Sequence, residues 1–210
     1  MLELSTSEAE RLAESGSAKE VSSFLLKGKI DGKDAISEEL GELLTGRLIK
    51  SAYLPMLGRL LGPLMAPAAA TILVRPLSDA LALGINTFHS ALIFLSAIGA
   101  GALAGRTMAD SYQRKMSEKA SVILSSGRIT GSRAEENISF LVREGRDPKS
   151  ALALLSSGCV RSERAQSELA QTVYEFGSAE DAKAVLDAGK ISAPYGIHLL
   201  RAKSEDSQEG

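Results

Sequence analysis

The sequence is poor in residues that carry redox, metal and aromatic chemistry. Its 210 residues include one cysteine, two histidines and no tryptophan, and aromatic residues make up 4%. The single cysteine, Cys159, cannot form a disulfide within the chain, which excludes a disulfide-stapled fold. Two histidines alone cannot build a metal site, because a structural zinc ion takes four protein ligands. We therefore expect no metal, no cofactor and no catalytic residue.

An excess of charge of one sign is also missing. The formal net charge is −2, and no half of the chain is strongly basic. Nucleic-acid binding requires clustered lysine and arginine without matching acids, so we expect no nucleic-acid partner. The first residues are acidic and lack a basic segment followed by an apolar run, which argues against a secretory signal.

The charge that is present is unevenly distributed. Hydrophobic residues make up 44% and charged residues 24%, which is typical of a globular protein. Residues 51–107 contain only four charged residues (Arg59, Arg75, Asp79 and Arg106), whereas both flanks are dense in both signs. This pattern predicts an N-terminal helical segment at 1–50, a hydrophobic hairpin at 51–107, C-terminal helical repeats at 108–203 and a flexible tail at 204–210.

The flanks share a short repeated pattern. An apolar pair is followed by two variable residues, a glycine, another variable residue, and Ile or Val; the glycines are Gly28, Gly127, Gly158 and Gly189. The last three are 31 residues apart. A glycine just after a helix can adopt positive φ without a Cβ clash, so these positions are predicted helix stops. The residues that follow three of them, Lys29, Arg128 and Lys190, are expected to be contacts at the rim of a binding surface.

The spacing between these glycines is helical. Capping signals such as Ser17 with Glu20 and Ser178 with Asp181 precede apolar residues that recur every three to four positions. We therefore predict an all-α fold in which short helix-pair repeats of about 31 residues flank the hydrophobic hairpin. The signatures of tetratricopeptide and ankyrin repeats are missing.

The hydrophobic middle contains two candidate membrane segments, at residues 53–75 and 80–105. Each exceeds the roughly 20 residues that a helix needs to cross the hydrocarbon core. Small faces for close helix packing are predicted at four glycines, namely Gly58, Gly62, Gly101 and Gly105. Basic residues flank the pair on both sides, so the positive-inside rule predicts a membrane localisation with both termini in the cytoplasm.

Two polar residues stand inside these segments. Arg59 and His89 would be costly within lipid unless they were paired or faced a cavity, which makes a pore or transport role one alternative. Pore-forming domains of the colicin type resemble this chain in hydropathy and length. A second alternative is a soluble helical protein in which the hairpin forms the buried core.

A glycine pattern in the middle raises a further alternative. Residues 99–104 match G-x-G-x-x-A and follow an apolar run, which resembles the dinucleotide-binding turn of Rossmann folds. Such a site would use Gly99 and Gly101. The acidic residue expected about twenty positions later should end a second strand, but Glu118 precedes the next apolar run instead. We therefore do not expect an enzyme.

The function predicted from the sequence is that of a non-catalytic, membrane-anchored adaptor or scaffold. Its helical repeats would present a cytoplasmic surface to a protein partner. The hairpin would contact membrane lipid, and its small faces make a homo-oligomer plausible.

Overall fold

The protein is largely helical. The computed structural model describes residues 3–53 and 87–205, with side chains from residue 95 onward in the second stretch. Apart from two short strands, β1 (Glu3–Leu4) and β2 (Lys29–Ile30), which pair in parallel, the described regular elements are helices. The predicted all-α fold class is therefore confirmed.

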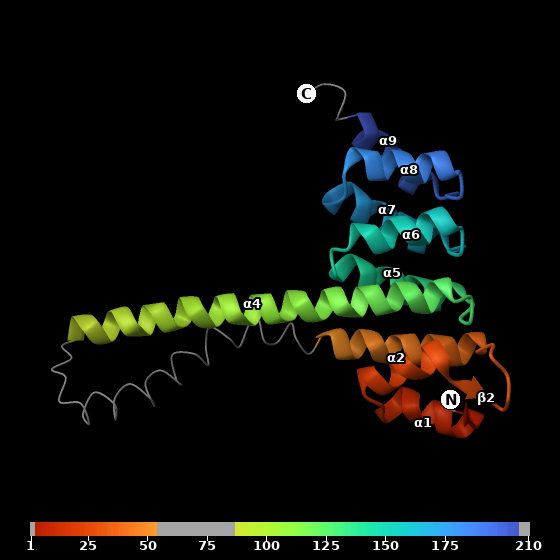
Figure 1. Cartoon of the computed structure of the whole chain (residues 1–210), viewed down its shortest axis with the longest axis horizontal. Coiled ribbons are helices and arrows are strands. Elements are labelled where there is room, and N and C mark those ends of the chain that lie inside the picture. Colours follow the sequence, from red (N-terminus) through yellow and green to blue (C-terminus); the bar gives the residue numbers. More distant parts are fainter. Residues whose placement is uncertain (1–2, 54–86, 206–210) are drawn as a thin grey trace. The chain divides into compact units, whose positions relative to one another are not determined.

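From α4 to α9, consecutive helices are joined by short connections (Figure 1). In chain order the described helices are α1 (Thr6–Ser15), α2 (Ala18–Lys27), a helix over residues 38–53, α4 (Thr87–Ser125), α5 (Ser132–Glu144), α6 (Pro148–Ser157), α7 (Glu163–Phe176), α8 (Ala179–Ala188) and α9 (Pro194–Glu205).

The chain divides into two compact units. One unit joins Met1–Ala52 to Gln113–Gly210, and the other consists of Tyr53–Tyr112. The two charged flanks of the sequence therefore belong to one unit, and the low-charge middle is inserted between them in the chain. Helix α4 begins in the second unit and ends in the first.

Helices α5 to α9 form a stack of two layers (Figure 1). Helix α7 packs against both α5 and α9 in one layer, and α6 packs against α8 in the other. Large apolar side chains fill the space between the layers, and 2% or less of each is exposed: Ile138, Leu141, Leu154, Leu169 and Leu200. Burial of these side chains supplies the main stabilising contribution to the stack.

Capping groups recur in this stack at a fixed spacing. Asp147 and Ser178 cap the N-termini of α6 and α8, and each accepts a hydrogen bond from a backbone N–H in the first turn. Gly158 and Gly189 follow the same two helices in the left-handed conformation, with φ of 70° and 60°. Both pairs of positions are 31 residues apart, the same step that separates Gly127 from Gly158.

Not every predicted helix stop uses positive φ. Gly28 follows α2 with φ of −73°, which is extended backbone. A Cβ at this position would lie 2.1 Å from Cδ2 of the Phe24 ring, so glycine is needed here for close approach to a buried aromatic side chain.

Arg128 joins the N-terminal helices to the stack. Its guanidinium donates hydrogen bonds to three backbone carbonyls, those of Leu25 (3.1 Å), Asp34 (3.0 Å) and Gly28. The carbonyls of the last turn of α2 have no partner within the helix, so the cation satisfies them. The donors of Arg128 are therefore engaged within the fold, and its role as a rim contact stays a prediction.

The predicted transmembrane hairpin is not supported. Its first segment, 53–75, lies outside the described residues except for Tyr53, and its second is described from Thr87 as part of α4. Among the described residues, no helix combines the length and apolar character needed to cross a membrane. The predicted membrane localisation, with both termini cytoplasmic, is therefore wrong.

The dinucleotide-binding alternative also fails on local structure. Gly99 and Gly101 lie inside the continuous helix α4, so no strand and no turn precede a helix at this point. The pyrophosphate site of a Rossmann fold requires that turn, because its backbone N–H groups contact the phosphates.

Candidate protein-binding surface

Three exposed side chains occupy the same position on successive helices of one layer. Arg133, Arg164 and Tyr195 are each the second residue of their helix, in α5, α7 and α9. The exposed fractions are 74% for each arginine side chain and 59% for Tyr195. We call these three residues the N-terminal row. Arginine and tyrosine are the residue types that contribute most often to hot spots in protein interfaces.

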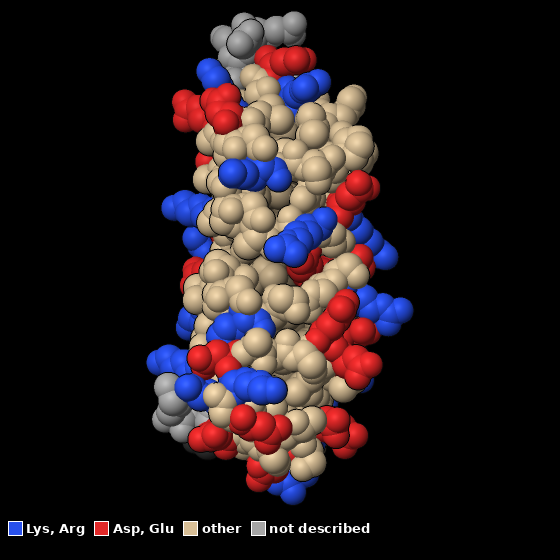
Figure 2. Space-filling view, turned by 90° about the vertical axis from the view of Figure 1, so that its right-hand side faces the viewer, with Lys and Arg blue, Asp and Glu red and all other residues tan. Residues whose placement is uncertain are grey.

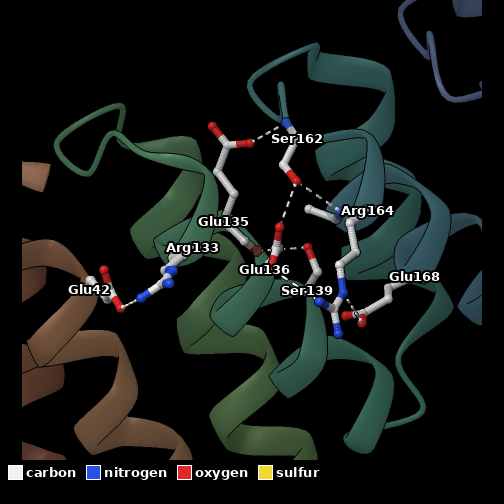
Figure 3. A network of polar contacts seen from close by, with 9 residues as sticks. Glu42, Arg133, Glu135, Glu136, Ser139, Ser162, Arg164 and Glu168 are labelled. Atoms are coloured by element: carbon white, nitrogen blue, oxygen red, sulfur yellow. Dashed lines mark hydrogen bonds and ion pairs between the residues drawn. The ribbon is translucent and has the colours of Figure 1, made fainter.

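Each arginine of the row is held by a glutamate on the preceding helix of the layer. Nη1 of Arg133 lies 2.7 Å from Oε1 of Glu42, and this hydrogen bond raises the pKa of Arg133. Nη1 of Arg164 lies 3.8 Å from Oε2 of Glu136 (Figure 3). Exposed ion pairs contribute less than about 1 kcal/mol to stability, so their effect here is to orient the guanidinium groups.

Helices α5 and α7 share further polar contacts beside this row. Between the two helices, the hydroxyl of Ser162, the N-cap of α7, donates to Oε1 of Glu136 in α5 at 3.2 Å. Within α7, Nε of Arg164 lies 3.8 Å from Oε1 of Glu168. Figure 3 shows these groups following one another from α5 to α7. The network fixes the position of Arg164 relative to α5.

A buried carboxylate beneath the row sets the start of α7. Only 5% of Glu135 is exposed. Its Oε2 accepts hydrogen bonds from the backbone N–H groups of Arg161 and Ser162, each at 2.7 Å. These N–H groups precede the first turn of α7, where the helix dipole favours a negative group. We call this arrangement the Glu135 clasp.

An amide makes the same arrangement one step later in the stack. Oε1 of Gln166 accepts from the backbone N–H groups of Ser192 (2.8 Å) and Ala193 (2.9 Å), just before α9. Its Nε2 donates to the carbonyl of Val160 at 2.8 Å. We call this the Gln166 clasp; Gln166 follows Glu135 by 31 residues. Sequence reasoning missed both residues; the sequence shows them only as two polar residues separated by the repeat spacing.

The glycines predicted to end helices, Gly28, Gly127, Gly158 and Gly189, lie in the turns that follow α2, α4, α6 and α8. In the turn after α8, the aliphatic stem of Lys190 packs over Gly158. A Cβ built at Gly158 would lie 3.4 Å from both Cβ and Cδ of Lys190. On the face drawn in Figure 2, side chains of both signs are interspersed with uncharged surface.

The residues predicted for the hairpin are not brought together as a site. Gly58, Gly62 and Arg59 lie outside the described residues, and His89 is described only as part of the backbone of α4. Gly101 and Gly105 lie in α4 and are half-buried. The pore alternative depended on these residues and gains no support from them.

In the described part of the chain, no group of three or more His, Cys, Asp or Glu side chains could hold a metal ion. No family model, no curated protein and no solved structure matches the sequence or the fold. The function must therefore be argued from the surface itself.

Proposed function

We propose that the protein is a non-catalytic helical-repeat adaptor that binds a protein partner through the N-terminal row, Arg133, Arg164 and Tyr195. The observation that supports this proposal is their common position on three neighbouring helices, all largely exposed. Stacked helix pairs present such rows as an extended surface, and partners of repeat proteins bind across several repeats at once.

The chemistry of the row suits a protein partner. Arg133 and Arg164 offer planar guanidinium groups that can donate to carboxylates or backbone carbonyls while stacking on aromatic rings. Tyr195 adds a large rigid surface that loses little conformational entropy on binding. The neighbouring glutamates, Glu42 and Glu136, keep the two arginines extended before a partner arrives, which lowers the entropic cost of association.

The proposal is tested by changing the row and a matched row on the other layer. The first variant carries Arg133→Ala, Arg164→Ala and Tyr195→Ala. The control carries Lys149→Ala and Glu180→Ala, two exposed residues at the second position of α6 and α8. Alanine is helix-compatible, so both variants should keep the circular dichroism spectrum of the parent.

The readout is quantitative affinity capture from a lysate of the organism of origin, followed by titration of the captured protein against each purified variant. We expect the row variant to lose at least tenfold in affinity, because three central side chains are removed. The control should bind as the parent does. Equal binding by parent and row variant, or equal loss in the control, would show that the row is not the binding surface.

The predicted homo-oligomer stays a prediction. It rests on the small faces of the hairpin, of which Gly101 and Gly105 lie in the described part of α4.

A further inference from the structure

A two-residue turn follows β2 at the surface of the first unit. Its residues, Asp31 and Gly32, are both exposed and both have positive φ, 48° and 77°. The backbone groups of Ile30 and Lys33 exchange two hydrogen bonds across the turn, at 3.0 and 2.8 Å. Glycine adopts this conformation without strain, whereas a residue with a Cβ is strained there. The backbone of Asp31 is therefore held in a conformation that it would leave if the turn opened.

The order of these two residues has a chemical consequence. The backbone nitrogen that follows an aspartate can attack the side-chain carboxyl and close a five-membered succinimide ring. A glycine at the following position favours this reaction, because it has no Cβ to obstruct the approach. Asp31 is the one aspartate in the sequence that precedes a glycine.

The structure leaves the attacking nitrogen unrestrained. Within the described part of the chain, no group accepts a hydrogen bond from the N–H of Gly32. The aspartates of α8 differ, because the N–H groups of a helix interior are bonded to carbonyls one turn earlier. Asp147 precedes a proline, whose nitrogen carries no hydrogen. Asp34 is exposed in the same loop as Asp31 but precedes an alanine, so it serves as an internal control.

We propose that Asp31 is a modification site at which the chain forms isoaspartate spontaneously. The nitrogen of Gly32 bonds to Cγ of Asp31, and the hydroxyl of the protonated carboxyl leaves as water together with the amide proton. A water molecule then opens the ring. Opening at Cγ restores aspartate; opening at the backbone carbonyl leaves a chain that runs through Cγ and carries a free α-carboxylate. The inference goes beyond the proposed binding function and does not rest on it.

The modified bond lies where the N-terminus is attached. The N–H of Asp31 donates to the carbonyl of Leu4 in β1 at 3.1 Å, and Oγ1 of Thr6, the first residue of α1, donates to Oδ2 of Asp31 at 2.8 Å. Isoaspartate lengthens the backbone by one carbon and moves the carboxylate, so these contacts are broken and β1 is released from β2. In the unmodified protein the Thr6 hydroxyl restrains the carboxyl and slows ring closure.

The test follows isoaspartate in the purified full chain during incubation at physiological temperature and neutral pH. One readout is methyl transfer from S-adenosylmethionine by a carboxyl methyltransferase specific for isoaspartate. The other is digestion with an endoproteinase that cuts before aspartate but not before isoaspartate. We expect methyl incorporation to increase with time while the cut before Asp31 is lost and the cut before Asp34 is kept. No loss at Asp31, or equal loss at both positions, would overturn the proposal.

Three variants test the site and its restraint. Asp31→Ser should lose the methyl signal, and the matched control Asp34→Ser should keep it. Thr6→Val removes the hydroxyl but leaves Ser5 and Glu8 to cap α1, so isoaspartate should form roughly two- to tenfold faster. A methyl signal that survives in Asp31→Ser would overturn the site, and a rate in Thr6→Val no higher than in the parent would overturn the restraint.

Hydrogen exchange tests the structural consequence. The isomerised fraction, separated by ion-exchange chromatography, should exchange the amide of residue 31 faster than the fresh protein, because its acceptor on β1 is lost. The amides of α7 should exchange equally in both fractions. Unchanged exchange at residue 31 would overturn the release of β1.

Discussion

The Glu135 and Gln166 clasps solve the same problem with different chemistry. Each side chain is buried and accepts two backbone N–H groups just before the next helix of its layer. The carboxylate of Glu135 holds the start of α7 with charge-assisted bonds. The amide of Gln166 holds the start of α9 with a neutral oxygen, and its nitrogen also satisfies the carbonyl of Val160.

The difference lies in what surrounds each clasp. A buried carboxylate is tolerable only where enough donors converge on it, and at Glu135 the positive end of α7 adds to two N–H groups. At Gln166 a buried carbonyl also needs a donor, which only the amide can supply. The two clasps therefore cannot exchange side chains freely, although they occupy equivalent positions.

Removing the carboxylate of Glu135 should have the largest effect on the free energy of unfolding. Glu135→Ala leaves the N–H groups of Arg161 and Ser162 without an acceptor, and each such group costs about 1–3 kcal/mol. We expect the free energy of unfolding to fall by about 2–4 kcal/mol in a urea titration. A loss below about 1 kcal/mol would mean that water or another side chain replaces the carboxylate.

Placing a carboxylate in the Gln166 clasp should have the second-largest effect on the free energy of unfolding. Gln166→Glu keeps an oxygen for Ser192 and Ala193 but removes the donor to Val160 and brings an anion near that carbonyl. We expect a loss of about 1–3 kcal/mol at neutral pH. The loss should shrink as the pH falls, because a protonated carboxyl can again donate to the carbonyl. Urea titrations at neutral and acidic pH measure the difference, and a loss independent of pH would contradict this explanation.

The fold class could be predicted from the sequence, but the tertiary contacts within the fold could not. The glycines and capping serines are local signals, so the all-α class could be derived from them. The clasps could not, because Glu135 and Gln166 look like ordinary polar residues of amphipathic helices until the next helix start is placed beside them. The same limit applies to Arg128, whose acceptors lie about a hundred residues earlier in the chain.

The membrane prediction failed for a different physical reason. That prediction rests on the length and low charge of residues 80–105, whereas no described helix is long and apolar enough to cross a membrane. Segment length and low charge alone do not establish a membrane span, because small and polar residues reduce the free energy gained by transfer to lipid.

The reverse exchange in the first clasp should have a smaller effect. Glu135→Gln retains one side-chain oxygen, and a single oxygen already accepts both N–H groups in the parent. The loss of charge assistance and the need to place an amide nitrogen should lower the free energy of unfolding by about 1 kcal/mol. If Glu135→Gln were as damaging as Glu135→Ala, the negative charge itself would be essential, and the comparison with Gln166 would fail.

The smallest effect on the free energy of unfolding is expected for Glu136, which follows Glu135 in α5. Glu136 also acts at the start of α7, but through surface groups: it accepts from the Ser162 hydroxyl at 3.2 Å and pairs with Arg164 at 3.8 Å. Partly exposed interactions of this kind are weakened by water and salt, so Glu136→Ala should cost less than about 1 kcal/mol. The cost should decrease further in high salt, whereas that of Glu135→Ala should not. Similar losses for the two neighbours would mean that burial of the acceptor does not determine the strength of the clasp.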